Sequence, residues 1–286
     1  MHSKKKFLEK YQPRYIFLAG LILVATAIWS AVFHLENDRL VVAFLDVGQG
    51  DAIFIEAPGG NQILIDGGPN KSVLSELSRV MPFYDRSIDA LILTHPHQDH
   101  VAGLVEVLKR YNVDFVFDSG DDASLAEFAE FKKLISEKNI QEIFARRGMR
   151  INLGAGARFD ILLPDEFIKG PNPHKNMVVG RLTYGNTCFL FMGDAEREHE
   201  FKILRDDIDC EVLKAGHHGS KTSSSEALLK AVSPEISVVQ VGEKNRYGHP
   251  YKAVLERLTA SAAKVFRTDT DGAIIIESDG RNIFVK

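Results

Sequence analysis

The sequence predicts an α/β fold in which two β-sheets are flanked by helices, preceded by one membrane-spanning N-terminal helix. Strand-like stretches come first, mixed helices and strands follow, and strands return at the end, which argues against a simple doubly wound sheet. Polar side chains able to bind a metal fall where predicted strands end, and functional loops gather at such places on a rigid scaffold. The third observation is a 19-residue run without charge, residues 15–33.

This run is long enough for a helix of roughly 30 Å, which would cross the hydrocarbon layer of a bilayer. A cleaved signal peptide is the alternative, but the run exceeds the usual ~7–15 apolar residues and no small-residue cleavage site follows. The basic flank before it is expected to stay in the cytoplasm. We therefore predict a single-pass protein of the cytoplasmic membrane with three parts: a basic cytoplasmic N-terminus at 1–14, a transmembrane anchor at 15–34 and an extracytoplasmic domain at 38–286.

Composition supports a folded domain and argues against a broadly basic surface for binding nucleic acid. The chain has 286 residues, of which 45% are hydrophobic, enough for a real core. Residues 1–35 carry a net charge of +4 within a chain of net charge -4, so the remainder is strongly acidic. Such a domain lacks the general basic field of a non-specific nucleic-acid binder. Cys188 and Cys210 lie in apolar, strand-like contexts, and we expect buried free thiols rather than a disulfide bridge.

The pattern of apolar residues and turn residues predicts the elements of the domain. Gly59-Gly60-Asn61 indicates a hairpin between the second and third strands, and the short apolar run 88–94 is typical of a buried strand. Predicted strands cover 40–46, 52–57, 62–66, 88–94, 114–117, 143–145, 158–163, 178–184, 187–192, 210–215 and 236–241, with three short strands at the end. Predicted helices cover 71–81, 101–111, 124–138, 195–205, 224–232 and 251–260.

The strongest chemical signal is His95-x-His97-x-Asp99-His100, which directly follows the predicted buried strand. Alternate residues of a turn after a strand can point the same way, so His95 and His97 can share one metal ion while Asp99 and His100 face a second. Imidazole and carboxylate ligands together suit Zn²⁺, with Mn²⁺ or Fe²⁺ as alternatives. A solvated polar turn would need neither this density of ligands nor a buried strand leading to it.

Further ligands are expected at later strand ends. Asp194 follows an apolar strand, and the preceding Gly193 allows close backbone approach, so Asp194 is the best candidate for a bridging carboxylate. His217 and His218 also follow a strand, but adjacent side chains leave it in different directions. At most one of them is expected to bind a given metal, and the other to contact substrate or donate a proton. His249 is balanced between a ligand and a structural residue.

Several polar residues flank glycines early in the chain, namely Asp46, Gln49, Asp51 and Asp66. Asp66, in Ile65-Asp66-Gly67-Gly68, is a candidate to orient a metal ligand through a hydrogen bond rather than by direct contact with the metal. Simple turn chemistry is the equal alternative, because aspartate and glycine are both favoured in turns.

These motifs, in this order, resemble the metallo-β-lactamase domain of the ComEC-type competence (DNA-uptake) protein family. The resemblance covers about residues 40–286 and includes the histidine-rich hexad, which is typical of the whole superfamily. The motifs more typical of this branch are Phe44-Leu45-Asp46-Val47-Gly48-Gln49-Gly50-Asp51-Ala52 and Arg246-Tyr247-Gly248-His249-Pro250.

The resemblance implies a four-layer αβ/βα sandwich with a two-metal site at one edge of the two sheets. Carried over residue by residue, it places His95 and His97 on the first metal and Asp99 and His100 on the second, with Asp194 between the two. Related phosphoesterases place a ligand at the second histidine of the pair, so His218 is expected to bind metal and His217 to lie nearer the substrate.

The expected activity is metal-dependent hydrolysis. Two divalent ions would lower the pKa of a bridging water from about 15.7 toward 7, giving an activated hydroxide. Asp99 would be essential, and His217, or His249 if it is not a ligand, would protonate the leaving group. We expect a phosphodiester substrate, with nucleic acid as one candidate in a DNA-uptake role. The alternatives are carboxylic esters, thioesters or lactones, whose hydrolysis needs the same ligands, and a non-catalytic metal-binding module of the cell envelope.

Overall fold

The computed structural model describes residues 13–29, 39–166, 175–261 and 264–286. The chain divides into two compact units, Met1–Asp38 and Arg39–Lys286. Both sheets and every candidate site residue belong to the second unit. The two units are therefore described separately.

The N-terminal unit corrects the predicted membrane anchor. Its described part is a helix at residues 13–29. Among the described residues, none of the helices combines the length and the apolar character needed to cross a bilayer. The predicted single-pass anchor at 15–34, and with it the placement in the cytoplasmic membrane with an extracytoplasmic C-terminal domain, is wrong. Part of that prediction, residues 1–12 and 30–34, lies outside the described residues.

The second unit contains two β-sheets, as predicted. The first has the strand order β15-β14-β1-β2-β3-β4-β5-β6 and the second the order β13-β12-β11-β10-β9-β8-β7. The strands of the first sheet are β1 Leu40–Phe44, β2 Ile53–Glu56, β3 Gln62–Ile65, β4 Ser87–Leu93, β5 Asn112–Asp118, β6 Gln141–Phe144, β14 Ile274–Ser278 and β15 Ile283–Val285. The strands of the second are β7 Arg150–Gly154, β8 Ala157–Leu163, β9 Val179–Tyr184, β10 Thr187–Phe191, β11 Val212–Lys214, β12 Ile236–Val239 and β13 Lys264–Arg267.

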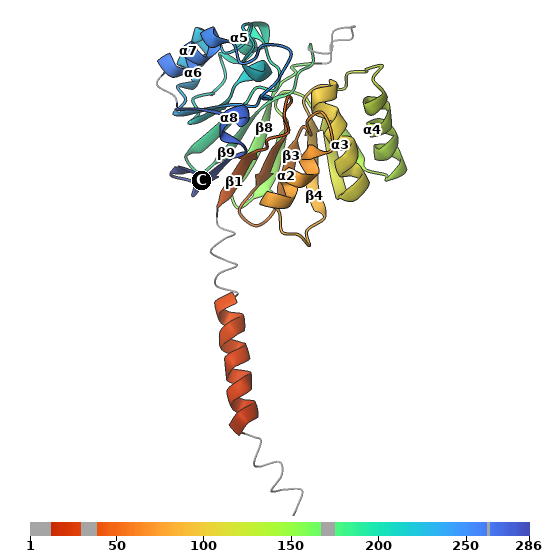
Figure 1. The fold of residues 1–286 in the computed structure, drawn as a ribbon, viewed down its shortest axis with the longest axis vertical. Helices are drawn as coiled ribbons and strands as arrows, with labels where there is room; N and C mark the ends of the chain where they lie inside the picture. The colour runs from red at the N-terminus through yellow and green to blue at the C-terminus, as the bar shows by residue number, and fades with distance from the viewer. Residues whose placement is uncertain (1–12, 30–38, 167–174, 262–263) are drawn as a thin grey trace, which may run out of the picture. The chain divides into compact units, whose positions relative to one another are not determined.

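Helices cover the outer faces of both sheets (Figure 1). Their bounds are α2 Ser72–Val80, α3 Gln98–Arg110, α4 Ala126–Glu137, α5 Arg197–Ile203, α6 Glu226–Val232, α7 Lys252–Ala260 and α8 Thr268–Asp271. Residues of α2, α3 and α4 pack on the first sheet, and residues of α5, α6 and α7 pack on the second. The predicted α/β arrangement of two sheets with helices outside is therefore confirmed.

Alternation along the strands produces the layers. Ile63 and Ile65 of β3 point into the core between the two sheets, whereas Leu64 between them packs with the helices. In β10, Phe189 enters the same central core and Leu190 packs toward the helices of the second sheet. Successive side chains of a strand point to opposite faces, so a sheet buried on both faces reads as a continuous apolar run.

Four strand ends place the candidate site at one edge of the sandwich. Strand β4 of the first sheet ends just before His95, and β10 of the second sheet ends just before Asp194. Strands β11 and β12 pair in parallel with each other, and β10 pairs in parallel with β11. The chain after β11 carries His218, and the loop after β12 carries His249. Carboxyl ends of parallel strands meet at one edge of a sheet, which is where α/β folds place their ligands.

The two cysteines differ from the prediction. Cys188 of β10 and Cys210, just before β11, are joined by a disulfide. Both residues are buried, as expected, but the prediction of free thiols is wrong. The physical reason is the parallel pairing of β10 with β11, which brings the two Cα atoms to 4.7 Å, within the range that a disulfide spans.

Two glycines let helix α3 lie directly against the loop after β3. A Cβ atom added to Gly103 would lie 1.7 Å from the carbonyl oxygen of Gly67. The backbones are instead bonded to each other, since Gly103 N donates to Gly68 O at 3.0 Å and Gly67 N donates to His100 O at 2.7 Å. This contact fixes the first turn of α3, and with it His100, beside Asp66.

We predict that Gly103→Ala destabilises the domain by about 3 kcal/mol, because the added methyl group overpacks a backbone-to-backbone contact. In an ordinary helix interior the same change stabilises by roughly 0.5–1 kcal/mol, so the sign of the effect is diagnostic. Chemical denaturation measures it, and Lys109→Ala on the exposed face of α3 is the control, expected within about 0.5 kcal/mol of the parent chain. A stabilised Gly103→Ala variant would contradict the close packing.

Candidate metal centre

The histidine-rich hexad spans the junction between β4 and α3. His95 follows the strand, His97 is the residue that caps the start of the helix, and Asp99 and His100 lie in its first turn. An aspartate in the first turn of a helix is favoured by the partial positive charge of the helix N-terminus. His95 and His100 are fully buried, whereas His97 and Asp99 are partly exposed. The hexad therefore has a buried side and an open side.

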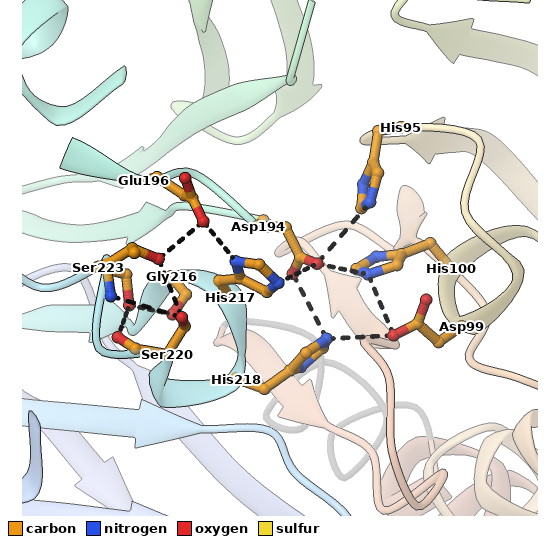
Figure 2. Close-up of polar contacts among 12 residues, drawn as sticks. His95, Asp99, His100, Asp194, Glu196, Gly216, His217, His218, Ser220 and Ser223 are labelled. Carbon is orange, nitrogen blue, oxygen red and sulfur yellow. Dashed lines mark hydrogen bonds and ion pairs between the residues drawn. The ribbon is translucent and has the colours of Figure 1, made fainter. Parts of the chain in front are cut away.

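Asp194 lies at the centre of this cluster (Figure 2). Its Oδ2 atom is 3.7 Å from His95 Nε2 and 3.4 Å from His100 Nε2, and its Oδ1 atom is 3.4 Å from His218 Nε2. Asp99 Oδ2 in turn lies 3.4 Å from His218 Nε2 and 3.9 Å from His100 Nε2. The two oxygens of Asp194 therefore face different histidines.

The histidine pair sits in an unusual turn. His217 and His218 lie in the short 3-10 turn Gly216–Gly219, and both have positive φ, 48° and 51°. Residues other than glycine adopt this region at a cost, and such strain persists where the surroundings impose it. Ser223 Oγ lies within hydrogen-bond distance of two carbonyl oxygens at this turn, Gly216 O at 2.7 Å and Ser220 O at 2.9 Å, and its one proton bonds the turn to the following chain. The turn directs His218 into the buried side and leaves His217 a quarter exposed.

Outer hydrogen bonds orient His100 and His218. The Nδ1 atom of His100 lies 2.8 Å from Asp66 Oδ2, and the Nδ1 atom of His218 lies 2.9 Å from Gln240 O. Because carboxylate and carbonyl oxygens accept hydrogen bonds, each Nδ1 is the donor. The Nε2 atom of each ring is left to face Asp194.

The same arrangement holds at His95 and His217. Thr94 Oγ1 donates to Asp66 at 2.6 Å, so it accepts from His95 Nδ1 at 3.1 Å. His217 Nδ1 lies 3.2 Å from Glu196 Oε1, while its Nε2 lies 3.7 Å from Asp194 Oδ2. Ring orientation by an outer carboxylate, hydroxyl or carbonyl is the usual support of a metal-binding histidine.

The electrostatics of the cluster favour a bound cation. Burial alone would raise the pKa of Asp194, but His218 and His100 outweigh it and hold that pKa well below its usual range. Burial opposes protonation of His218, yet Asp194 and Asp51 raise its pKa to about 10. For Asp99, burial raises the pKa, but His100 and then His218 lower it to about 2. Carboxylates that hold protons on neighbouring imidazoles hold a divalent ion in their place, with release of those protons.

The donor set fits such an ion. His100 Nε2, His218 Nε2 and Asp194 Oδ1 are buried and make no hydrogen bond to any of the described residues. Buried polar atoms without a hydrogen bond are costly unless another partner satisfies them. Among the described residues, His95, His100 and Asp194 present ligand atoms within 4.8 Å of one another, and so do Asp99, His100 and His218. These two groups share His100, and Asp51 joins two further groups, one with Asp66 and His100 and one with Asp194 and His218.

Two predicted residues lie at the margin of the centre. The ring of His97 is 4.3 Å from that of His95, centroid to centroid, but His97 is in neither of the two groups. The His249 ring is 5.7 Å from that of His217 and 6.4 Å from that of His218. The structure therefore brings all the sequence-predicted site residues together, with His97, His217 and His249 on the open side.

A buried lysine supports the centre and was missed from the sequence. Lys214 of β11 is fully buried, donates to Asp51 in a short hydrogen bond and donates to Gly193 O at 2.9 Å. Asp51 Oδ1 lies 3.3 Å from His218 Nδ1. Burial alone would raise the pKa of Asp51, but Lys214 and His218 lower it. The pair joins the loop after β1 to the second sheet, and a lone lysine in an apolar strand gives no signal of it.

We predict that Lys214→Met destabilises the domain by about 3–5 kcal/mol, because it leaves a buried carboxylate without its cation. Adding Asp51→Asn should recover part of the loss, since the second change removes that charge. Chemical denaturation of the single and double variants measures the coupling. Lys230→Met on the exposed face of α6 is the control. Equal stability of Lys214→Met and the parent chain would show that the ion pair contributes nothing.

Comparison with curated proteins gives three similar sequences of named bacterial proteins. ComE operon protein 3 of Bacillus subtilis is 30% identical over 93% of this chain and 37% of its own length. Recombination protein 2 of Haemophilus influenzae is 32% identical over 89% of this chain and 31% of its own length. Competence protein ComA of Neisseria gonorrhoeae is 31% identical over 84% of this chain and 32% of its own length. The chain thus spans about a third of the relatives it matches, and the predicted resemblance to competence proteins is confirmed.

Solved structures and a family profile agree on the fold. The metallo-beta-lactamase fold protein YhfI from Bacillus subtilis matches 84% of this chain and all of its own, with a TM-score of 0.59 at 15% identity. Tm1679, a metal-dependent hydrolase of the beta-lactamase superfamily, matches 83% of this chain and 98% of its own, with a TM-score of 0.55 at 12% identity. The profile of the Metallo-beta-lactamase superfamily matches residues 45–243, which include His95, Asp194 and His218. With its two helix-covered sheets and its histidine and aspartate cluster at their common edge, the chain belongs to the metallo-beta-lactamase superfamily.

Proposed function

We propose that this chain is a two-metal phosphodiesterase. The observation that carries the proposal is the position of Asp194, whose two carboxylate oxygens face different histidines at 3.4–3.7 Å. A carboxylate placed in this way serves as a bridge between two cations. Metallo-beta-lactamase superfamily membership supports metal-dependent hydrolysis at the level of reaction class, and the proposal concerns the finer reaction.

The proposed ligands divide into two sets that share Asp194. One cation would be held by His95 and His97, and the other by Asp99, His100 and His218. The second set is supported by the close approach of its three ligand atoms, which lie within 4.8 Å of one another. The first is supported by the burial of His95 beside Asp194 and by the ring contact of His97 with His95.

The chemistry of the ligands favours zinc. Neutral imidazole nitrogens and carboxylate oxygens without thiolates suit Zn²⁺, and Mn²⁺ or Fe²⁺ accept the same donors. When bound, a pair of such ions lowers the pKa of water and polarises a phosphoryl group for in-line attack. Zn²⁺ is therefore the proposed ion, with the other two as outcomes of metal analysis.

His217 is the proposed proton donor to the leaving group. Its side chain is a quarter exposed and lies on the open side of the centre, where a substrate enters. Glu196 holds its Nδ1 at 3.2 Å, and this contact fixes the ring so that Nε2 points toward the centre. A histidine oriented by a carboxylate is a common general acid or base. His249, whose ring is 5.7 Å from that of His217, is the second candidate for this step.

The relatives support a phosphodiester substrate over a carboxylic ester. Their names, Competence protein ComA and Recombination protein 2, describe processes that handle DNA. DNA is joined by phosphodiesters, and two-metal centres stabilise both the attacking and the leaving oxygen of such a displacement. Turnover of bis-p-nitrophenyl phosphate, set against p-nitrophenyl acetate and a thioester, separates the two substrate classes in one assay.

We predict that Asp99→Ala lowers phosphodiester turnover by more than about 100-fold, because loss of even an outer partner of a metal ligand commonly costs about 10- to 100-fold. The fold should persist, since Asp99 is partly exposed. Turnover of bis-p-nitrophenyl phosphate and circular dichroism measure the two effects. Asp114→Ala, an exposed aspartate of β5, is the matched control and should keep full activity. Activity of Asp99→Ala close to that of the parent would refute the proposed centre.

We also predict that chelation lowers the melting temperature by roughly 8–16 °C. An ion present at about 1,000 times its dissociation constant stabilises by about 4 kcal/mol, and each kcal/mol shifts the midpoint by about 2–4 °C in a domain of this size. Mass spectrometry of the untreated protein should find about two divalent ions per chain. Asp194→Asn should melt at the same temperature with and without the chelator. An identical response of the parent and the variant would place the ions elsewhere.

A further inference from the structure

A cleft of about 480 Å³ lies directly beside the candidate metal centre. His97 and Asp99, at the start of α3, form one wall, and residues 244–247, in the loop after β12, form the other. His95, His100, Asp194 and His218 are buried, whereas Asp99 and His97 are partly exposed. A substrate therefore reaches the centre from the side of this cleft, and its volume falls within the range of small-ligand sites.

The loop wall of the cleft is cationic and aromatic. Lys244 and Arg246 are both exposed there. Tyr247, which follows Arg246 in the sequence, is 46% exposed. This concentration of positive charge contrasts with the acidic balance of the chain outside its first residues. Two basic side chains on a loop are ordinarily solvated. Here the side chains of Lys244 and Arg246 line a cleft beside a site proposed to cleave a negatively charged phosphodiester. The charge is placed where a substrate phosphate would enter.

Hydrogen bonds hold this loop in a defined shape. Asn245 Nδ2 donates to Gly242 O at 2.9 Å and to His249 O at 2.7 Å. Its Oδ1 accepts from Tyr247 N at 3.2 Å and from His249 N at 3.0 Å. Gly242 N in turn donates to Gln49 Oε1 at 3.2 Å, which ties the loop to the turn after β1. The cleft wall is therefore built before a ligand arrives, and little entropy is lost on binding.

Tyr247 is the half-exposed aromatic side chain of this wall. Its ring stacks on the ring of His249 at 5.7 Å, centroid to centroid, with an angle of 23° between the planes. The guanidinium of Arg246 lies 5.1 Å from the centre of the Tyr247 ring, and its Nη2 donates to Tyr247 Oη at 2.9 Å. Unpaired nucleobases are commonly bound on such aromatic rings and arginine planes, with cations on the adjoining phosphates.

We propose that this cleft binds one nucleotide unit of a single-stranded nucleic acid, with its phosphates against Lys244 and Arg246 and its base on Tyr247. This inference rests on the proposed phosphodiesterase function and adds a substrate class to it. A base must be unpaired to stack on a side chain, so the cleft selects single strands over duplexes. A small carboxylic ester would use neither the two cations nor the ring.

The test measures binding to strands that differ only in their bases. The full-length, metal-loaded chain is titrated into a fluorescent oligothymidylate of about 12 nucleotides, within the roughly 4–16 that such sites span. A phosphorothioate backbone keeps the charge and resists hydrolysis. An abasic strand with the same backbone is titrated in parallel, and an oligouridylate tests RNA against DNA. Fluorescence anisotropy gives the dissociation constant of each complex.

Tyr247→Ala should weaken binding of oligothymidylate about tenfold and of the abasic strand by less than about twofold, because only the stacked base is lost. Tyr247→Trp should restore most of the affinity. Lys244→Ala and Arg246→Ala should weaken both strands alike and should each reduce the salt dependence of binding by about one phosphate contact. Tyr84→Ala and Lys252→Ala change an exposed tyrosine and an exposed lysine outside the cleft and should bind as the parent does.

The outcomes separate this inference from the proposed function. If the parent chain turns over bis-p-nitrophenyl phosphate but Tyr247→Ala and Tyr84→Ala bind oligothymidylate equally well, the nucleotide site is refuted and the phosphodiesterase stands. Equal affinity of the parent for the abasic strand and oligothymidylate also refutes the site. If binding depends on Tyr247 but no phosphodiester is cleaved, the proposed function is refuted and the nucleotide site stands.

Discussion

Charge compensation around Asp194 is the constraint on which the rest of the structure depends. A carboxylate buried this deeply is tolerated only beside compensating positive charge. Its partners at 3.4–3.7 Å are the imidazoles of His95, His100 and His218, and the last two also contact Asp99. Imidazoles in that position carry protons or a metal ion. Every outer contact, from Asp66 on His100 to Gln240 on His218, keeps Nε2 of a ring directed at this one centre.

The two sheets of the sandwich meet at that centre. His95 follows a strand of the first sheet, while Asp194 and His218 follow strands of the second. Lys214 and Asp51 join the same two sheets a short distance behind the histidines, through a buried ion pair. Two charged links between the sheets therefore share one edge, and the central apolar core fills the space behind them. Loss of either link leaves a buried carboxylate without a positive partner, and the protein interior cannot solvate that charge as water does.

Much of the fold and the site was predictable because its signals are local. Buried strands ending in chelating residues identify β4 and β10 without knowledge of the tertiary structure. Local patterns failed where a long-range contact decides the outcome. The Cys188–Cys210 bridge depends on the pairing of β10 with β11, and the role of Lys214 depends on a residue far away in sequence. Strand β7 was missed because it is short and carries only two large apolar side chains, and helix α8 because it is a single turn of polar residues. The N-terminal prediction relied on the apolar character of one run, and among the described residues none of the helices is both long and apolar enough to cross a bilayer.

The residues of the site fall into a buried group and an exposed group. The buried group belongs to the fold that this chain shares with other superfamily members, and the exposed group lies at the start of α3 and on the loop after β12. In the proposed function, the buried residues of the centre hold the metal ions that activate water, a chemistry that does not select one substrate. Proteins with very different sequences share the fold of this chain. Selection of a substrate is then assigned to the open side, where Asp99 and His97 line a cleft together with residues 244–247. Loops on a rigid scaffold vary at little cost to the core, whereas the buried centre tolerates no change of charge. In the proposed function, substrate specificity is therefore assigned to the loop after β12, and the hydrolytic chemistry to the strand ends beside that loop.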